Sequence, residues 1–293
     1  MTTIYADNAA TTRLLPQVLD KMIPYLTEEY GNPSSLYSFG QAARQGVDAA
    51  RITMAECLHC RPDEVFITSG GSEADNWALK MVAESLEKKG KKHIVSTVFE
   101  HHAILHALNA LEKRGFEITL LPVYENGIVR VEDVAAAIRP DTALVSVMFA
   151  NNEIGTIQPI AEIGALCRER KVLFHTDAVQ AVGQLEIDLS RLPVDMLSLS
   201  AHKFHGPKGV GVLYLREPER FRPLLTGGGQ QRGHGGALIV VSAAAVEAAV
   251  VPEGDGVRGG VPALPGRHYV QVSQYVQRGG GAVIVRSAHR AVI

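Results

Sequence analysis

The sequence predicts an α/β domain built on a largely parallel, buried β-sheet. Two observations carry this prediction. Short apolar runs of strand length recur up to residue 215, and segments with apolar side chains at helical spacing separate several of them. Strands that are joined through helices pair in parallel and are covered on both faces, so their sequences are expected to be continuously apolar.

The elements follow in order along the chain. Helical spacing of apolar side chains predicts helices near 15–26, 43–58, 72–89, 101–114, 131–138 and 160–170. Strand-like runs occupy 65–68, 93–96, 118–121, 143–149, 172–175, 196–199 and 210–215. Several of the strands are followed by glycines or polar side chains, which is where a parallel sheet presents its ligand-binding edge.

Bulk composition excludes several classes of protein. The 293 residues carry a formal net charge of −2, with 46% hydrophobic and 20% charged residues, as in ordinary soluble domains. This balance gives no electrostatic reason to expect nucleic acid or a membrane surface as a partner. The N-terminus lacks a basic segment followed by an apolar core, and the longest mostly apolar stretch, 237–251, is short for a membrane span. We therefore expect a cytoplasmic protein.

The turn from Ser69 to Glu73 links a predicted strand to a predicted helix. Glycines at 70 and 71 allow a tight turn and a close approach to a ligand. The start of the helix offers free N–H groups and a positive dipole end, which suit a phosphate. The residues alone equally allow an ordinary turn in which Ser72 caps the helix.

Lys203 directly follows a predicted strand and stands between His202 and His205, before a Gly-Pro turn. A lysine that forms a Schiff base must be partly deprotonated, and burial or nearby cationic groups lower its pKa. The plainer alternative for this segment is a loop that binds phosphate or nucleic acid.

Other polar side chains follow strands or begin a helix. Asp177 ends a strand and points to the ligand crevice of a parallel sheet, although it could simply cap a helix. The amides at 151 and 152 follow another strand and could bond a ligand or form a turn. His101 could stack on an aromatic ring or move protons, whereas we expect His102 and His106 to be structural.

The cysteines do not form a recognisable framework. The sequence has three, too few for a set of structural disulfides. Cys57 and Cys60 form a CxxC, which could be a redox pair or half a zinc site. No second CxxC is present and the pair ends an amphipathic helix, so we predict a structural role and no metal site. Cys167 lies in a helical apolar pattern and is expected in the core.

Taken together and in this order, the motifs resemble one family. It is the group of cysteine desulfurases that serves iron–sulfur cluster and nitrogenase maturation, within the fold-type I pyridoxal-phosphate (PLP) enzymes related to class V aminotransferases. The resemblance runs from Tyr5–Thr12 and Gly31–Ser35 through the motifs above and the NNEIG of 151–155, and ends at Gly227–Gly233. It implies an N-terminal segment, 1–15, followed by a three-layer αβα large domain over 16–233. It also implies that the protein is a homodimer.

The resemblance also implies roles for individual residues. Lys203 would hold PLP covalently, and His101 would stack on its ring and help to transfer protons. Asp177 would pair with the pyridine nitrogen and Gln180 with the phenolic oxygen. The remaining contacts would be Gly71, Ser72, Ser200 and His202 to the phosphate, and Asn152 to an oxygen of the substrate or cofactor.

The implied activity is the removal of sulfur from L-cysteine, which leaves alanine. A mobile enzyme cysteine would take the sulfur and pass it to an acceptor such as an iron–sulfur scaffold protein. Two alternatives stay open: another PLP-dependent lyase or aminotransferase that needs no cysteine, and a non-catalytic chain that at most binds PLP.

The resemblance stops after residue 233. More than half of residues 234–293 are Gly, Ala or Val, and no threonine follows Thr226. The family's small C-terminal domain is not recognisable, and Cys167 is the last cysteine, so the loop with the nucleophilic cysteine is missing. We hypothesise a frameshift near codon 234 and predict that residues 234–293 lack a well-packed core.

Overall fold

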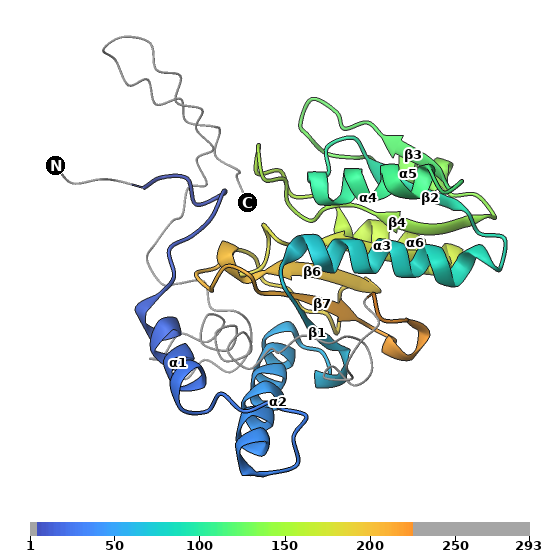
Figure 1. Ribbon diagram of the computed structural model, residues 1–293. Coiled ribbons are helices and arrows are strands. Elements are labelled where there is room, and N and C mark those ends of the chain that lie inside the picture. The colour runs from blue at the N-terminus through green and yellow to red at the C-terminus, as the bar shows by residue number, and fades with distance from the viewer. Residues whose placement is uncertain (1–4, 225–293) are drawn as a thin grey trace, which may run out of the picture.

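The computed structural model describes residues 5–224, which fold into three layers, a central sheet with helices on both faces (Figure 1). The sheet has seven strands in the order β1-β7-β6-β5-β4-β2-β3. Strand β7 pairs antiparallel with both of its neighbours, and the other pairs are parallel. The predicted α/β class with a mostly parallel sheet is confirmed.

Each strand coincides with one of the predicted apolar runs to within a few residues. The strands are β1 (Val65–Thr68), β2 (His93–Thr97), β3 (Glu117–Leu121), β4 (Thr142–Ser146), β5 (Leu173–Asp177), β6 (Met196–Ser200) and β7 (Gly211–Leu215). All residues of β4, β6 and β7 are buried. Burial on both faces explains why β7 is continuously apolar instead of alternating, whereas β4 and β6 also bury serine or threonine side chains.

The helices also follow the predicted spacing. They are α1 (Pro16–Thr27), α2 (Ser38–Leu58), α3 (Gly71–Glu87), α4 (His102–Glu112), α5 (Val131–Ala137) and α6 (Ile160–Arg170). Helix α2 begins before the start of the predicted range, 43–58. The apolar pattern missed its first turn because most residues there are exposed. It ends where His59 takes a left-handed conformation and its N–H closes onto the carbonyls of Ala55 and Glu56.

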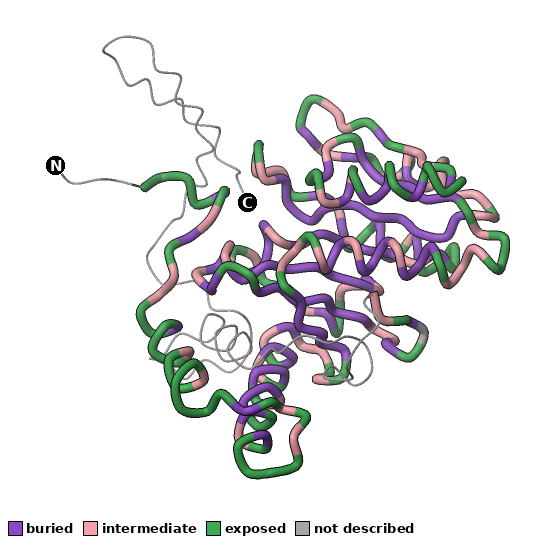
Figure 2. The backbone as a smooth tube through the Cα atoms, in the orientation of Figure 1, coloured by how far each residue is buried: buried purple, intermediate pink, exposed green. Residues whose placement is uncertain are grey.

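Two apolar clusters lie on opposite faces of the sheet. Helices α3 and α4 supply the cluster that includes Trp77 and Leu108. Helices α2, α5 and α6 supply the cluster that includes Met54, Val134 and Ile163. Figure 2 shows the buried backbone running through the strands between these helical layers. The sheet thus separates the two apolar clusters. Polar side chains lie at the edge formed by the carboxyl ends of the parallel strands.

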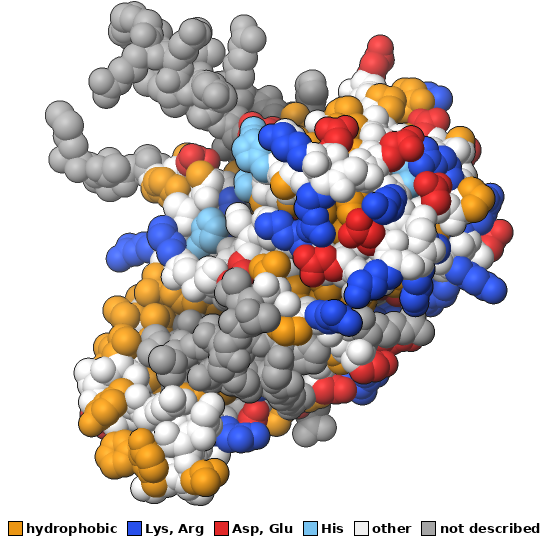
Figure 3. Space-filling model, turned by 45° about the vertical axis from the view of Figure 1, so that its right-hand side comes forward, with side chains coloured by type: hydrophobic (Ala, Val, Ile, Leu, Met, Phe, Trp, Pro, Cys, Tyr) orange, Lys and Arg blue, Asp and Glu red, His pale blue; other side chains and the backbone are white. Residues whose placement is uncertain are grey.

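Helix α1 and the loop after it stand away from this core. Of the helix, only Val18 is buried. Large apolar side chains are exposed on α1, on the loop and on the first turn of α2, namely Leu19, Ile23, Leu26, Tyr30, Leu36, Tyr37 and Phe39. Figure 3 shows apolar side chains gathered at the end of the molecule where α1 and α2 lie. Within residues 5–224, no helix is both long and apolar enough to cross a membrane.

The predicted tail, 234–293, lies outside the described residues, so its packing stays a prediction. The same holds for Gly227–Gly233, the last motif of the resemblance. The division into segments 1–15, 16–233 and 234–293 also remains a prediction.

Candidate active site

Lys203 and Asp177 meet at the carboxyl ends of neighbouring strands. Strand β5 ends at Asp177 and pairs in parallel with β6, which leads through Ser200 into a short 3₁₀ turn, Ala201–Lys203. Burial lowers the pKa of the Lys203 amine, and the carboxyl of Asp177 opposes that shift. The amine therefore loses its proton more readily than an exposed lysine, as Schiff-base chemistry requires.

Asp177 is buried but remains the carboxyl best able to carry charge here. Burial raises its pKa to about 6, while the backbone N–H of Val179 and the charge of Lys203 oppose the rise. The Val179 N–H lies 2.9 Å from Oδ1 of Asp177. The alternative that Asp177 caps a helix is wrong, because the residues after it form turns.

The N-terminal segment supplies the contacts of the lysine amine. Nζ of Lys203 donates to the carbonyl of Ala9 and, at 3.1 Å, to that of Ala10. The side-chain amide of Gln180 donates to the same Ala9 carbonyl at 2.9 Å. Gln180 thus lies beside Lys203, as its expected role requires, and in this structure its amide is bonded to the N-terminal segment.

Thr12 ties the N-terminal segment to the turn that carries Lys203. Its buried hydroxyl donates to the carbonyl of His202 at 2.9 Å and accepts the backbone N–H of His205 at 2.7 Å. The ring of His202 bonds the Thr11 hydroxyl at 3.0 Å. The sequence gives no local signal for this clamp, since its partners are about 190 positions apart along the chain.

A glycine cradle lies beside Ser200 at the start of α3. Gly70 occupies the cap position with φ 154°, so Ser72 falls in the first turn, and the alternative that Ser72 caps the helix is wrong. A Cβ on Gly71 would stand 2.8 Å from a methyl carbon of Val179 and 3.6 Å from Cβ of Ser200. The free N–H groups of α3 and its positive dipole end therefore open next to Ser200, an arrangement that suits a phosphate.

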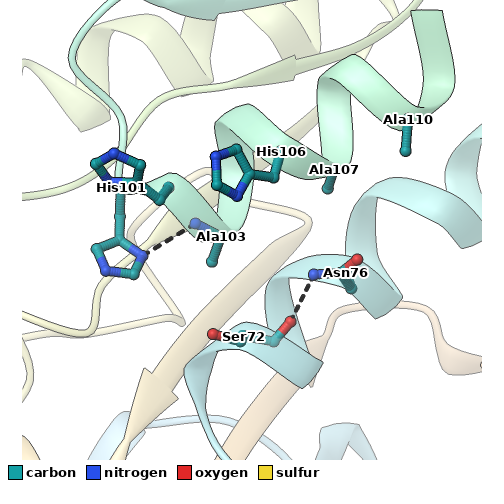
Figure 4. A pocket seen from close by; sticks show the side chains of 8 residues that line it. Ser72, Asn76, His101, Ala103, His106, Ala107 and Ala110 are labelled. Carbon is teal, nitrogen blue, oxygen red and sulfur yellow. Dashed lines mark hydrogen bonds between the residues drawn. The ribbon is translucent and has the colours of Figure 1, made fainter. Parts of the chain in front are cut away.

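His101 caps α4 and borders a hollow between α3 and α4. Its Nδ1 accepts the backbone N–H of Ala103 at 3.1 Å, which fixes the ring. Burial lowers the pKa of His101, and the charge of Lys203 lowers it further, so the ring is neutral near pH 7. Figure 4 shows the side chains of Ser72 and His101 at this hollow, whose volume is about 340 Å³. His106 contributes to its wall.

Asn152 stands in a turn that its neighbour holds in place. The amide of Asn151 donates to the Phe99 carbonyl at 3.0 Å and accepts the backbone N–H groups of Glu153 and Ile154. The amide of Asn152 instead bonds the carboxyl of Glu153 at 2.9 Å. Of the two predicted amides, the first builds the turn, and the second is only partly buried.

Three buried ionisable groups near Asp177 were not identified from the sequence. Burial raises the pKa of Glu100 to about 8 and that of Asp75 well above its usual range. Burial also lowers the pKa of His175 to about 3. Their positions in the sequence could have indicated two of them. Glu100 immediately precedes His101. His175 lies two residues before Asp177 on β5, so the side chains of His175 and Asp177 point to the same face of the sheet.

Comparison with known proteins gives one family match and several similar proteins. Residues 4–235 match the family described as Aminotransferase class-V. The chain is 56% identical over 227 residues to "Cysteine desulfurase IscS" of Clostridium botulinum (strain Kyoto / Type A2), covering 78% of this chain and 57% of that protein. It is 50% identical over 227 residues to the "Cysteine desulfurase IscS" of Methanosarcina thermophila, covering 78% and 56%. The chain thus spans little more than half the length of these relatives.

Solved structures of similar proteins have the same fold as this chain. A structure titled "NIFS-LIKE PROTEIN" superimposes with a TM-score of 0.81 at 43% identity, covering 85% of this chain and 70% of that one. A structure titled "SspA in complex with cysteine" gives a TM-score of 0.82 at 37% identity, covering 84% and 72%. The three-layer arrangement with its strand-end edge is therefore shared with these proteins.

Proposed function

The chain belongs to the class-V aminotransferase family, and on that premise we propose that it is a PLP-dependent cysteine desulfurase chain that acts on L-cysteine. The observation that carries the proposal is the half-buried Lys203 amine, with a lowered pKa, beside the buried carboxyl of Asp177. The names of the relatives support the substrate, since they are cysteine desulfurases, and one neighbouring structure is titled as a complex with cysteine.

The residues of this edge fit PLP. The cradle of Gly70 and Gly71 beside Ser200 has no room for side chains at Gly71 and suits a phosphate. Asp177 is buried in the site, where its carboxylate would accept a hydrogen bond from the ring N–H of PLP. The amine of Lys203 is the nucleophile that would bind the aldehyde. When bound, PLP supplies an electron sink for negative charge that develops on the substrate.

The side chains around Lys203 would have separate roles in binding PLP and moving protons. With PLP bound, the Asp177 carboxylate would pair with the ring nitrogen and favour its protonated form, which strengthens the electron sink. The Lys203 amine and the neutral ring of His101 would move protons to and from the substrate, and their lowered pKa values support this role. Ser200, the start of α3 and the His202 ring would fix the phosphate end, so that the reacting end faces Lys203.

The cysteines of the sequence are not placed to receive sulfur. All three lie within the described residues, at the end of α2 and in α6. Burial raises the pKa of Cys57 to about 11 and those of Cys60 and Cys167 to about 12, so little reactive thiolate forms near pH 7. This observation favours a second candidate function, PLP binding without sulfur transfer, or PLP chemistry that needs no cysteine.

Partners and location are also proposals. The exposed apolar side chains of α1 and the following loop support assembly with a second copy of the chain, because large exposed apolar patches mark interaction surfaces. An iron–sulfur scaffold as sulfur acceptor and a cytoplasmic location rest on the family resemblance.

Absorbance spectroscopy with added PLP tests the proposal directly. We expect the full chain to develop the absorbance band of lysine-bound PLP, and Lys203→Ala to lose that band while its apo fold is unchanged. Lys208→Ala, at an exposed lysine of the same loop, is the matched control and should keep the band. A band of equal strength in the Lys203→Ala variant would rule out the assigned role of this lysine.

An assay for alanine separates the two candidate functions. Release of alanine from L-cysteine, together with persulfide on the protein or sulfide in solution, supports the desulfurase. A PLP band without alanine supports the second candidate.

A further inference from the structure

A polar network is buried between helix α3 and the sheet, next to the proposed cofactor site. The hydroxyl of Ser146 bonds Nδ1 of His175 at 2.9 Å, and that of Ser198 bonds Nε2 at 3.0 Å. The hydroxyl of Ser96 donates to the Ser146 carbonyl at 2.8 Å. The network thus crosses the adjacent strands β2, β4, β5 and β6, and all of these side chains are fully buried.

Asp75 joins this network from helix α3. Its Oδ1 lies 3.7 Å from Nε2 of His175, and the residue is 1% exposed. Neither carboxyl oxygen accepts a well-formed hydrogen bond within residues 5–224, and the nearby Ser198 hydroxyl only partly stabilises a charge there. Since His175 and Asp177 share one face of β5, Asp75 and Asp177 approach the same part of the site.

The charges of this cluster follow from burial. Burial and then the charge of Asp177 raise the pKa of Asp75 well above its usual range, and Glu100 adds to the rise. The imidazole of His175 stays neutral because burial lowers its pKa to about 3. Asp177 ionises first because the Val179 N–H and Lys203 favour its charge. Of the carboxyls in this cluster, Asp177 therefore favours its charged form most.

We propose that Asp75 is a positioning residue of the cofactor site, which acts on Asp177 through His175 and the Ser198 hydroxyl. This inference rests on the proposed PLP binding. The raised pKa of Asp75 disfavours a second charge beside Asp177, and its polar group faces the imidazole and keeps it and the hydroxyl in one arrangement. An apolar side chain at this position would remove the polar group that faces the imidazole and the hydroxyl from helix α3.

The test is a PLP titration of the full chain, followed by absorbance between about pH 5 and pH 8.5. We expect Asp75→Leu to weaken PLP binding roughly tenfold or more, because it exposes buried polar groups to an apolar neighbour. We also expect the pH at which half of the binding is lost to rise, since a less polar surrounding raises the pKa of Asp177. Asp75→Asn keeps the shape and an uncharged polar group, so it should restore both properties to within about threefold and a few tenths of a pH unit.

A merely structural Asp75 would lower the unfolding temperature of the apo protein without moving the pH midpoint of PLP binding, and that result would overturn the inference. A downward shift of the midpoint in Asp75→Asn would also overturn it, because this shift would mean that Asp75 is charged. If Asp75→Leu does not fold, Ser198→Ala takes its place and should shift the midpoint in the same direction. Absence of the PLP band in the unaltered chain would instead refute the proposed function.

Discussion

At the scale of single residues, the site separates three carboxyl groups by their surroundings. Asp177, Glu100 and Asp75 are all buried, yet only Asp177 receives both a backbone N–H and the field of a lysine. Glu100 accepts the Thr97 hydroxyl at 2.7 Å and the Met148 N–H at 3.0 Å through one oxygen, and its second oxygen has no partner among the described residues. Hydrogen bonds on one oxygen do not compensate for burial, so Glu100 keeps its proton near pH 7.

This difference predicts how stability depends on pH in Glu100→Gln. Glu100 has a folded-state pKa of about 8 against an ordinary value of 4.5. Between these values the unfolded chain gives up the proton that the folded chain keeps, so Glu100 costs stability as the pH rises from about 4.5 to about 8. We expect Glu100→Gln to be more stable than the original protein by on the order of 1–3 kcal/mol at pH 8, and by little at pH 5.

Urea denaturation of the apo protein at the two pH values measures this difference. Glu112→Gln is the matched control, because it makes the same substitution at an exposed position at the end of α4. A gain for Glu100→Gln that is equal at both pH values would mean that better packing, and not lost ionisation, stabilises the variant.

At the scale of elements, the N-terminal segment behaves as part of the site. Polar contacts hold it to the turn after β6: the Ala9 and Ala10 carbonyls accept from Lys203, and the Thr12 hydroxyl bonds the backbone of His202 and His205. His205 has a positive φ of 69°, an unfavourable conformation for a residue with a side chain. The hydrogen bond from its N–H to Thr12 helps to hold the turn in that conformation.

Thr12→Val tests this dependence with little change in shape. The variant removes the acceptor for the His205 N–H and the donor to the His202 carbonyl, so we expect it to lower the free energy of unfolding by about 1–3 kcal/mol. PLP affinity should fall together with stability, because the turn that carries Lys203 loosens. Thr12→Ser keeps the hydroxyl and should retain most of both. Chemical denaturation and PLP titration measure the pair, and equal losses in the two variants would show that the methyl group matters and the hydroxyl does not.

At the scale of the whole molecule, the features that could be predicted from the sequence are those that depend on a local pattern of side chains, such as strands and helices. Strand β6 and helix α6 are visible as an apolar run and a periodic stripe, because burial selects side chains position by position. Lys203 and Asp177 were found because each directly follows such a strand. Asp75 and Thr12 were missed as site residues, since their roles depend on partners about 100 and 190 positions away. Local pattern cannot report contacts that only the folded chain creates.

Helices within residues 5–224 already cover both faces of the sheet, and this observation predicts the effect of removing residues 234–293. The family match ends at residue 235. We expect the shortened chain to unfold within roughly 2 °C of the full chain, a difference below about 1 kcal/mol for a domain of this size. Its PLP titration should also be unchanged. Removal of residues 1–12 is the contrasting control, because it deletes the contacts of Ala9, Ala10 and Thr12 with the Lys203 turn and should weaken both properties. A large loss of thermal stability on removing 234–293 would contradict the predicted domain division and show that the tail packs on the large domain.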